Sequence, residues 1–227
     1  MRLSVVFPFF NEEGSLPRIE TELVPVLHGL GVEYEIVAVD DGSTDGSKAL
    51  VLDLKERVQG LRLLEHPHNR GLGAALRTGF EAATGDAIVT FESDFTYPPV
   101  QIAKLIIRQM ESGADCVAGV AMHGRKVPLL RRLGSDAVNR IYRLWAGPYA
   151  SWTPLFRLYR TEAVRSLELE SEGFEINAEI LVKLLRAGRK VIEVPVDLVD
   201  RKEGASKMRV LKELRRHASL TYRLLFR

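Results

Sequence analysis

Short hydrophobic runs alternate with longer amphipathic stretches over the first half of the chain. Runs rich in Val, Ile and Leu predict strands at 2–7, 35–39, 61–65, 87–91 and 115–119. The stretches between them predict helices at about 15–29, 45–58, 72–83 and 99–112. Strands that alternate with helices are typical of an α/β fold, so we expect a doubly wound, mainly parallel sheet.

The alternation breaks in the second half of the chain. The pattern there predicts a basic amphipathic helix at 129–145, a strand at 153–160, a helix at 173–187, an edge strand at 191–199 that Pro195 interrupts, and a last helix at about 207–226. Neither an internal repeat nor a Pro/Gly/Ser-rich linker divides the sequence. We therefore expect residues 1–227 to form one domain with two halves, 1–120 and 121–227.

The composition is that of an ordinary globular domain, with 46% hydrophobic and 27% charged residues among 227. Cys116 is the single cysteine, which excludes an internal disulfide framework and a cysteine-based zinc site, and we expect it in the core. The sequence has neither a run of roughly 18 uncharged apolar residues nor a signal-peptide pattern. These features predict a cytoplasmic protein.

The small net charge of +2 hides an uneven distribution. Residues 1–120 carry 10 basic and 18 acidic side chains, whereas residues 201–227 carry nine basic and two acidic ones. Carboxylates gathered in one half suggest a metal or sugar site, and the basic segments suggest contacts with phosphate or an anionic surface. Because no zinc-finger spacing or RNA-binding signature accompanies the basic segments, we do not expect a nucleic-acid partner.

Acidic groups follow three of the predicted strands, in the sequences Asn11-Glu12-Glu13, Asp40-Asp41-Gly42-Ser43 and Glu92-Ser93-Asp94. Ligand sites of doubly wound sheets lie beyond the carboxyl ends of the strands, so these groups converge on one edge. The Asp40-Asp41 pair can bind a ribose or a base edge, or it can simply cap the turn and the following helix. Glu92 and Asp94 can share Mg²⁺ with the diphosphate of a nucleotide, or they can form a solvated acidic turn.

Two further segments carry candidate chemistry. Asn69-Arg70-Gly71-Leu72-Gly73 opens a helix, and we interpret its glycines as allowing close packing while Arg70 supports a nucleotide site. Arg201 and Lys207 lie in a loop that suits phosphate oxygens, with a solvated basic loop as the alternative. His66 and His68 flank Pro67 and are predicted to be solvated turn residues. Trp145 and Trp152 are interpreted as packing residues or as a platform for an apolar acceptor.

Six motifs, taken in order, resemble those of the inverting glycosyltransferases of family 2. They are Val5-Val6-Phe7-Pro8-Phe9-Phe10-Asn11-Glu12, Val39-Asp40-Asp41-Gly42-Ser43-Thr44-Asp45, Asn69-Arg70-Gly71-x-Gly73-x-Ala75, Glu92-x-Asp94-x-x-x-Pro98-Pro99, Phe156-Arg157-Leu158-Tyr159 and Asp200-Arg201-x-x-Gly204-x-Ser206-Lys207. Within that family the sequence is most similar to the polyprenyl (dolichyl) phosphate mannosyltransferases. The resemblance implies a GT-A fold, a nucleotide-sugar donor, Mg²⁺ or Mn²⁺, and a lipid phosphate acceptor.

The resemblance also implies roles for individual residues. The nucleotide would be held by Pro8, Asn11, Glu12, Asp40, Asp41 and Arg70. The metal would be held by Glu92, Asp94 and Thr96. Phosphates of donor and acceptor would be faced by Arg131, Ser135, Arg201 and Lys207, and the catalytic set would be Asp94, Arg201 and Lys207. Glu92 stands where the family usually has Asp, Thr96 where it has Gln, and Ser151 where it has Asp; Glu92 keeps the charge and Thr96 an oxygen.

The expected reaction is transfer of mannose from GDP-mannose to a polyprenyl phosphate, with inversion at the anomeric carbon. One alternative is a UDP-sugar such as UDP-glucose as donor, with a lipid phosphate or a soluble acceptor. Another is a catalytically silent protein that binds nucleotide sugars. A lipid acceptor further implies contact with the cytoplasmic face of a membrane and leaves room for a membrane partner subunit.

The last predicted helix is amphipathic. One face carries apolar residues, namely Leu211, Leu214, Ala218, Tyr222 and Leu225, and an adjoining face carries cations, namely Arg209, Lys212, Arg216, Arg223 and Arg227. The apolar face either packs on this protein's own domain or contacts a membrane surface together with the helix at 129–145, whose cations are Arg131, Arg132, Arg140 and Arg143.

Overall fold

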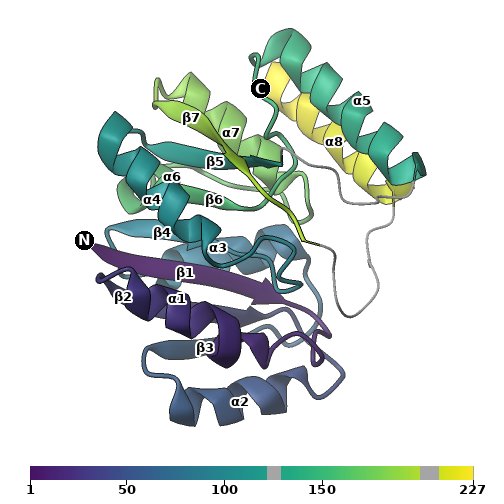
Figure 1. Ribbon diagram of the computed structural model, residues 1–227. Coiled ribbons are helices and arrows are strands. Elements are labelled where there is room, and N and C mark those ends of the chain that lie inside the picture. Colours follow the sequence, from purple (N-terminus) through teal and green to yellow (C-terminus); the bar gives the residue numbers. More distant parts are fainter. Residues whose placement is uncertain (122–128, 200–209, 227) are drawn as a thin grey trace.

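The computed structural model describes residues 1–121, 129–199 and 210–226, and the side chains within them except those of 129–136 and 210. Its centre is a seven-stranded sheet with the order β3-β2-β1-β4-β6-β5-β7 (Figure 1). The strands are β1 (Arg2–Phe9), β2 (Glu33–Asp40), β3 (Leu61–Glu65), β4 (Ala87–Thr90), β5 (Cys116–Ala121), β6 (Arg157–Arg160) and β7 (Val191–Val196). Only β6 runs antiparallel to its neighbours, β4 and β5. The predicted α/β class and mainly parallel sheet are confirmed.

Helices cover both faces of the sheet (Figure 1). In chain order they are the π-helix η1 (Ile19–Leu23), α1 (Val24–Gly29), α2 (Ser47–Arg57), α3 (Leu72–Ala82), α4 (Gln101–Ser112), α5 (Leu129–Trp145), α6 (Thr161–Arg165), α7 (Ile176–Arg186) and α8 (Val210–Phe226). Among the helices of the described residues, none is both long enough and apolar enough to cross a membrane.

Several predicted bounds were wrong for local reasons. The helix predicted at 15–29 begins at Ile19 and changes from π to α geometry, because Pro25 near the start of α1 has no N–H group to donate. The strand predicted at 153–160 shortens to β6, since its partner β4 offers only four residues for pairing. The strand predicted at 191–199 ends with the Ala121–Val196 pair, and it lies at the edge of the sheet as Pro195 predicted.

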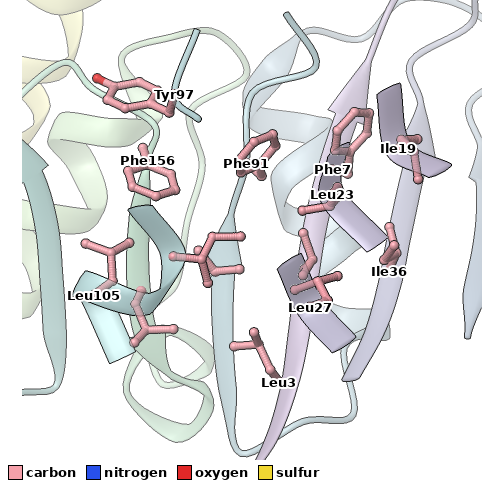
Figure 2. Packing of buried hydrophobic residues seen from close by; sticks show 14 of the residues in the cluster. Leu3, Phe7, Ile19, Leu23, Leu27, Ile36, Phe91, Tyr97, Leu105 and Phe156 are labelled. Atoms are coloured by element: carbon pink, nitrogen blue, oxygen red, sulfur yellow. The ribbon is translucent and has the colours of Figure 1, made fainter. Parts of the chain in front are cut away.

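Alternating side chains of the central strands build two hydrophobic cores. On β1, Val5 and Phe7 point into the core beneath η1, α1, α2 and α4, whereas Val6 points into the core beneath α3 and α7. Figure 2 shows part of the first core, where Phe7 and Phe91 stack with ring centroids 6.1 Å apart. β1 and β2 each bury side chains on both faces of the sheet, as is usual for parallel sheets.

Cys116 is fully buried in the second core, which confirms its predicted place. Burial raises the pKa of its thiol to about 12, because a thiolate would be poorly solvated there. The thiol is therefore an inert core group at neutral pH.

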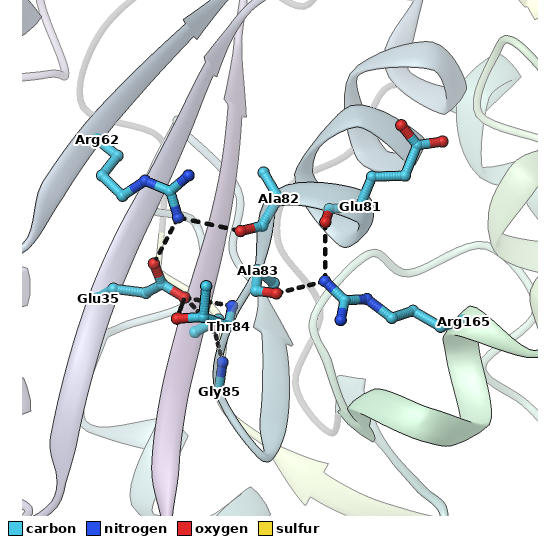
Figure 3. A network of polar contacts seen from close by, with 9 residues as sticks. Glu35, Arg62, Glu81, Ala82, Ala83, Thr84, Gly85 and Arg165 are labelled. Atoms are coloured by element: carbon cyan, nitrogen blue, oxygen red, sulfur yellow. Dashed lines mark hydrogen bonds and ion pairs between the residues drawn. The ribbon is translucent and has the colours of Figure 1, made fainter.

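A buried carboxylate joins β1, β2 and the loop before β4 (Figure 3). Glu35 accepts hydrogen bonds from the Ser4 hydroxyl at 2.6 Å, the Thr84 amide at 2.6 Å and the Arg62 guanidinium at 2.9 Å. Burial alone would raise its pKa, but these donors outweigh burial and lower the pKa from 4.5 to about 2. The ionised form therefore stabilises the fold.

We expect Glu35→Gln to lower the free energy of unfolding at pH 7 by roughly 2–3 kcal/mol, because the charge-assisted hydrogen bonds are lost. Since the folded pKa of Glu35 is lowered, its contribution is complete above pH 4.5 and is lost as the pH falls towards 2. Denaturant unfolding at several pH values measures this. The exposed Glu56→Gln is the control, and a pH-independent difference between Glu35→Gln and wild type would contradict the account.

Candidate active site

Loops that follow β1, β2 and β4 leave the sheet at the same edge. β1 pairs with β2 in parallel so that Phe9 lies opposite Asp40, and it pairs with β4 so that Val6 lies opposite Thr90. The acidic groups after these strands therefore lie at the same edge, although they are up to 82 residues apart in the sequence. This edge is the candidate active site.

The loop after β1 is fastened to the loop after β2. Asn11 accepts a hydrogen bond from the Thr44 amide at 2.7 Å through its side-chain oxygen, and its own amide donates to the Ser43 hydroxyl at 2.9 Å. The Glu12 amide donates to the Ser47 hydroxyl at 2.8 Å. Asn11 and Glu12 thus lie beside the Asp40 turn, and Pro8 is buried opposite Val39 in the strands beneath it.

Asp40 and Asp41 are both almost fully buried, at 3% and 4% exposed. One oxygen of Asp40 accepts a hydrogen bond from the Ser43 amide at 2.8 Å, which closes the turn. The oxygens of Asp41 accept from the amides of Arg70 and Gly71 at 2.9 and 2.8 Å. Asp41 therefore fixes the start of α3 against the end of β2.

His66 is not the solvated turn residue that the sequence predicted. It is 7% exposed, and its ring lies between Asp41, 2.7 Å from Nδ1, and the Thr78 hydroxyl, 3.0 Å from Nε2. The turn after β3 folds back onto α3, so that His66 points inward while His68 is exposed as predicted. The local sequence around Pro67 carries no signal for this, because the burying surface comes from α3.

The loop after β4 is held from beneath by aromatic rings. Phe95 is fully buried, with its ring centroid 5.3 Å from that of Phe91, and the Arg18 guanidinium lies 4.4 Å above the Phe95 ring. Arg18 also donates to the Asp94 carbonyl at 3.3 Å. These contacts keep Asp94 at the edge of the sheet with its side chain half-buried.

The three predicted metal ligands differ in their surroundings. The Thr96 hydroxyl and amide donate to one carboxylate oxygen of Asp94, at 2.5 and 3.0 Å, so that Thr96 orients Asp94. Glu92 is half-buried at the end of β4. Among the described residues no group of three or more His, Cys, Asp and Glu side chains is placed to hold a metal ion. A pair of hard carboxylates still fits Mg²⁺ or Mn²⁺, because such ions take the remaining ligands from diphosphate and water.

A segment from the second half of the chain covers the start of α3. The Gly73 amide donates to the Glu172 carbonyl at 2.7 Å. A Cβ atom on Gly71 would collide with the same carbonyl, and one on Gly73 would collide with the Ser171 carbonyl. The close packing predicted for these glycines is confirmed, and it brings residues 171–173 next to the exposed Arg70 turn.

Arg157 is a fully buried residue that the sequence analysis named only within a motif. Its guanidinium donates to the Asn177 carbonyl at 2.6 Å and to the Ser151 carbonyl, which ties β6 to α7 and to the loop at 151. Trp152 is fully buried and stacks on Tyr142 with 5.2 Å between ring centroids, so it is a packing residue. A platform at Trp152 for an apolar acceptor is therefore wrong.

The helix α8 packs on its own domain, mainly through a face other than the one that the sequence predicted, although Leu214 of the predicted face packs against the second core. The buried positions are Glu213, His217, Leu220 and Leu224. Leu211, Tyr222 and Leu225 of the predicted apolar face remain exposed. Tyr222 and Leu225, together with Ile141 of α5, border an apolar groove of about 360 Å³ between the two helices, which lie side by side in Figure 1.

Two cations of α8, Arg216 and Arg223, have specific partners. Arg223 donates to Glu170 at 2.7 Å and to the Ser171 hydroxyl at 3.1 Å, and Glu213 accepts from the Phe174 amide at 3.3 Å. The helix thereby holds the segment that covers α3. Burial lowers the pKa of His217 to about 4, so its ring is neutral where it meets Tyr142.

The structure describes no side chain for four predicted phosphate-binding residues. Arg201 and Lys207 fall outside the described residues, and of Arg131 and Ser135 only the backbone within α5 is described. The cations Arg209 and Arg227 of the last predicted helix fall outside them as well.

The mainly parallel sheet with helices on both faces matches the GT-A fold that the sequence predicted. The family model "Glycosyl transferase family 2" matches residues 4–167, and the chain belongs to this family. The family 2 part of the sequence resemblance is thereby confirmed.

Solved structures of mycobacterial proteins have the same fold. Glucosyl-3-phosphoglycerate synthase of M. tuberculosis is 20% identical with a TM-score of 0.74, over 99% of this chain and 79% of that one. The same synthase in complex with Mn²⁺ and UDP-glucose gives 20% identity and a TM-score of 0.72, over 99% and 78%. A further mycobacterial protein is 22% identical with a TM-score of 0.73, over 94% and 69%.

We expect Gly73→Ala to lower the free energy of unfolding by roughly 1–3 kcal/mol, because its Cβ must displace the Ser171 and Glu172 backbone. This cost exceeds the gain of up to about 1 kcal/mol in helix propensity. Gly29→Ala is the control, since a Cβ there meets no atom within 4 Å. Denaturant unfolding compares them, and equal stability of the two variants would show that residues 171–173 do not pack on α3.

Proposed function

We propose that this chain is a glycosyltransferase that uses a UDP-sugar donor and a phosphate-bearing acceptor. The observation that carries the proposal is the carboxyl edge of the sheet: the loops with Asp40 and with Glu92 and Asp94 leave at this edge, and Asp41 holds the Arg70 turn beside it. The fold is also that of a synthase solved with Mn²⁺, UDP and phosphoglyceric acid. The likeness to a protein that binds UDP-glucose favours UDP-sugar, the alternative donor of the sequence analysis, over GDP-mannose.

Each part of the edge has a role in this proposal. Pro8, Asn11, Glu12 and Asp40 form the nucleoside side, where a carboxylate can accept hydrogen bonds from ring N–H groups and ribose hydroxyls. Asp41 acts by holding the Arg70 turn in place. Glu92 and Asp94 would hold Mg²⁺ or Mn²⁺, with Thr96 orienting Asp94, and such an ion would supply positive charge beside the diphosphate.

Inverting transfer to a phosphate needs no strong base in the protein, because the acceptor oxygen is already ionised at neutral pH. The chain's task is then to hold the acceptor oxygen in line behind the anomeric carbon and to stabilise the charge that grows on the leaving diphosphate. By the family resemblance, Arg201 and Lys207 supply that stabilisation, while Arg131 and Ser135 face the phosphates.

We expect Asp94→Asn to weaken Mn²⁺-dependent binding of UDP and to lower sugar transfer about 100-fold or more, because one ligand charge is lost where the diphosphate binds. Calorimetry with UDP, with and without Mn²⁺, and a UDP-release assay with UDP-glucose measure this. Asp53→Asn, an exposed site on α2, is the control.

Two outcomes would change the assignment. Unaltered metal dependence in Asp94→Asn would remove Asp94 from the metal site. Tight binding of UDP-glucose and GDP-mannose without any turnover would favour a silent nucleotide-sugar-binding protein.

A lipid phosphate is the second candidate acceptor, with mannose from GDP-mannose as in the sequence expectation. The observation that favours it is the exposed apolar surface of α5 and α8, on which Leu144 is 82%, Leu211 76% and Phe226 71% exposed. Exposed Arg140, Lys212 and Arg215 lie on the same two helices. An apolar surface with surrounding cations suits an anionic bilayer, to which each cation contributes about 1 kcal/mol. This reading makes the protein peripheral to the membrane, where a membrane partner subunit has access to it.

We expect the protein to float with liposomes that contain anionic lipid and to be released by salt, since part of the attraction is electrostatic. The pair Leu144→Gln and Phe226→Gln should lower the bound fraction at least about fivefold, because two exposed apolar anchors are lost. Ile107→Gln with Met110→Gln is the control, because these residues are also apolar and exposed but lie on α4. Equal flotation of both pairs would refute membrane contact through α5 and α8.

A further inference from the structure

The buried ring of His66 connects three elements at the candidate active site. Its Nδ1 lies 2.7 Å from Asp41, which follows β2, and its Nε2 lies 3.0 Å from the hydroxyl of Thr78 on α3. The His66 amide donates to the Asp40 carbonyl at 2.8 Å. Side chain and backbone thus fix His66 from both sides.

The hydrogen-bond partners determine which nitrogen of the His66 ring carries the proton. An ionised carboxylate only accepts hydrogen bonds, so Nδ1 carries the proton and donates to Asp41. The Thr78 hydroxyl can donate or accept, and it therefore satisfies Nε2 in the neutral ring as well as in the charged ring. His66 consequently holds one carboxylate oxygen of Asp41 in a set position.

The position of the Asp41 carboxylate in turn fixes the backbone of the Arg70 turn. The oxygen that faces His66 also accepts the Arg70 amide at 2.9 Å, and the other oxygen accepts the Gly71 amide at 2.8 Å. Gly71 has a φ of 99° and directly precedes α3. A rotation of the Asp41 carboxylate would break both amide contacts and release the turn that carries the exposed Arg70.

The packing around the loops leaves little room for a different arrangement. A Cβ atom on Gly42, which has a φ of 74°, would collide with the His68 backbone, so the turn after β2 touches the turn after β3. On the other side, residues 171–173 press on the start of α3. His66 is therefore the residue of the turn after β3 whose side chain can act on the Arg70 turn, and it does so through Asp41.

We propose that His66 is a positioning residue of the nucleotide site: it orients Asp41, and Asp41 sets the Arg70 turn that contacts the donor. His66 itself does not touch the donor, since its ring is enclosed by Asp41 and Thr78. The inference rests on the proposed function for its nucleotide, but the link from His66 to the amides of Arg70 and Gly71 is a property of the free protein.

Two substitutions of similar size separate the two contacts of the ring. In His66→Asn the side-chain amide takes the place of Nδ1 and can still donate to Asp41. In His66→Gln the amide reaches the place of Nε2, and the donor to Asp41 is lost. A merely structural role of the ring gives no reason for the two variants to differ.

The first measurement is amide hydrogen exchange by NMR on the free protein. We expect His66→Gln to speed exchange of the Arg70 and Gly71 amides about tenfold, as for the loss of about one hydrogen bond. In His66→Asn the exchange rate should stay near that of wild type. Equal exchange in both variants and wild type would overturn the proposal, whatever the ligand of the site is.

The second measurement is calorimetry of UDP with Mn²⁺ in a double-mutant cycle with Arg70→Ala. We expect His66→Gln to weaken UDP binding about 5- to 10-fold when Arg70 is present and to have no further effect in Arg70→Ala, while His66→Asn keeps most of the affinity. A loss that persists in full without Arg70 would show a general disturbance and overturn the positioning role.

The two measurements distinguish failure of the proposed nucleotide from failure of the proposed role of His66. Wild-type protein that binds no UDP, together with the expected exchange pattern, would refute the proposed nucleotide and leave the His66 link intact. If His66→Gln does not fold, Thr78→Val is measured in its place, because this substitution removes the partner of Nε2 and loosens the His66 ring. Unchanged exchange of the Arg70 amide in Thr78→Val would overturn the proposal.

Discussion

The parallel pairing of β1 with β2 and β4 is the constraint on which the rest of the molecule depends. Parallel strands end at the same edge, so the loops after β1, β2 and β4 are brought together without any contact between their side chains being needed first. Both faces of these strands are buried, and shifting one strand by a single residue would move its core side chains to the wrong face. The position of the acidic groups is therefore fixed by the hydrophobic core.

Buried polar groups complete what the core begins. Glu35, Asp41 and Arg157 each lie almost or entirely out of solvent, and each forms a hydrogen bond with at least one backbone group of another part of the chain. Burying a charge is costly unless it is hydrogen-bonded, so each of these residues has one arrangement that is much better than the alternatives. Asp41 has this effect at the candidate active site, where it fixes the Arg70 turn.

The second half of the chain supports the site from outside. Arg223 and Glu213 on α8 hold the segment at 170–174, and this segment packs on Gly71 and Gly73 at the start of α3. The helix that carries the exposed apolar surface is thus connected, by direct contacts, to the element that carries Arg70. A molecule bound to the exposed faces of α8 and α5 would therefore lie two contacts away from the start of α3.

The sequence by itself determined the α/β class, the five strands of the first half and the acidic groups at their ends, because these follow from local hydrophobic periodicity. It also determined the close packing of α3, because glycine has no side chain to prevent it. Tertiary structure alone decided that His66 is buried, that Trp152 is a packing residue, and which face of α8 is covered. A helical wheel shows which face is apolar but not which face meets a neighbour. A turn residue such as His66 is buried only when another element, here α3, supplies the covering surface, and that information lies in the packing of distant segments.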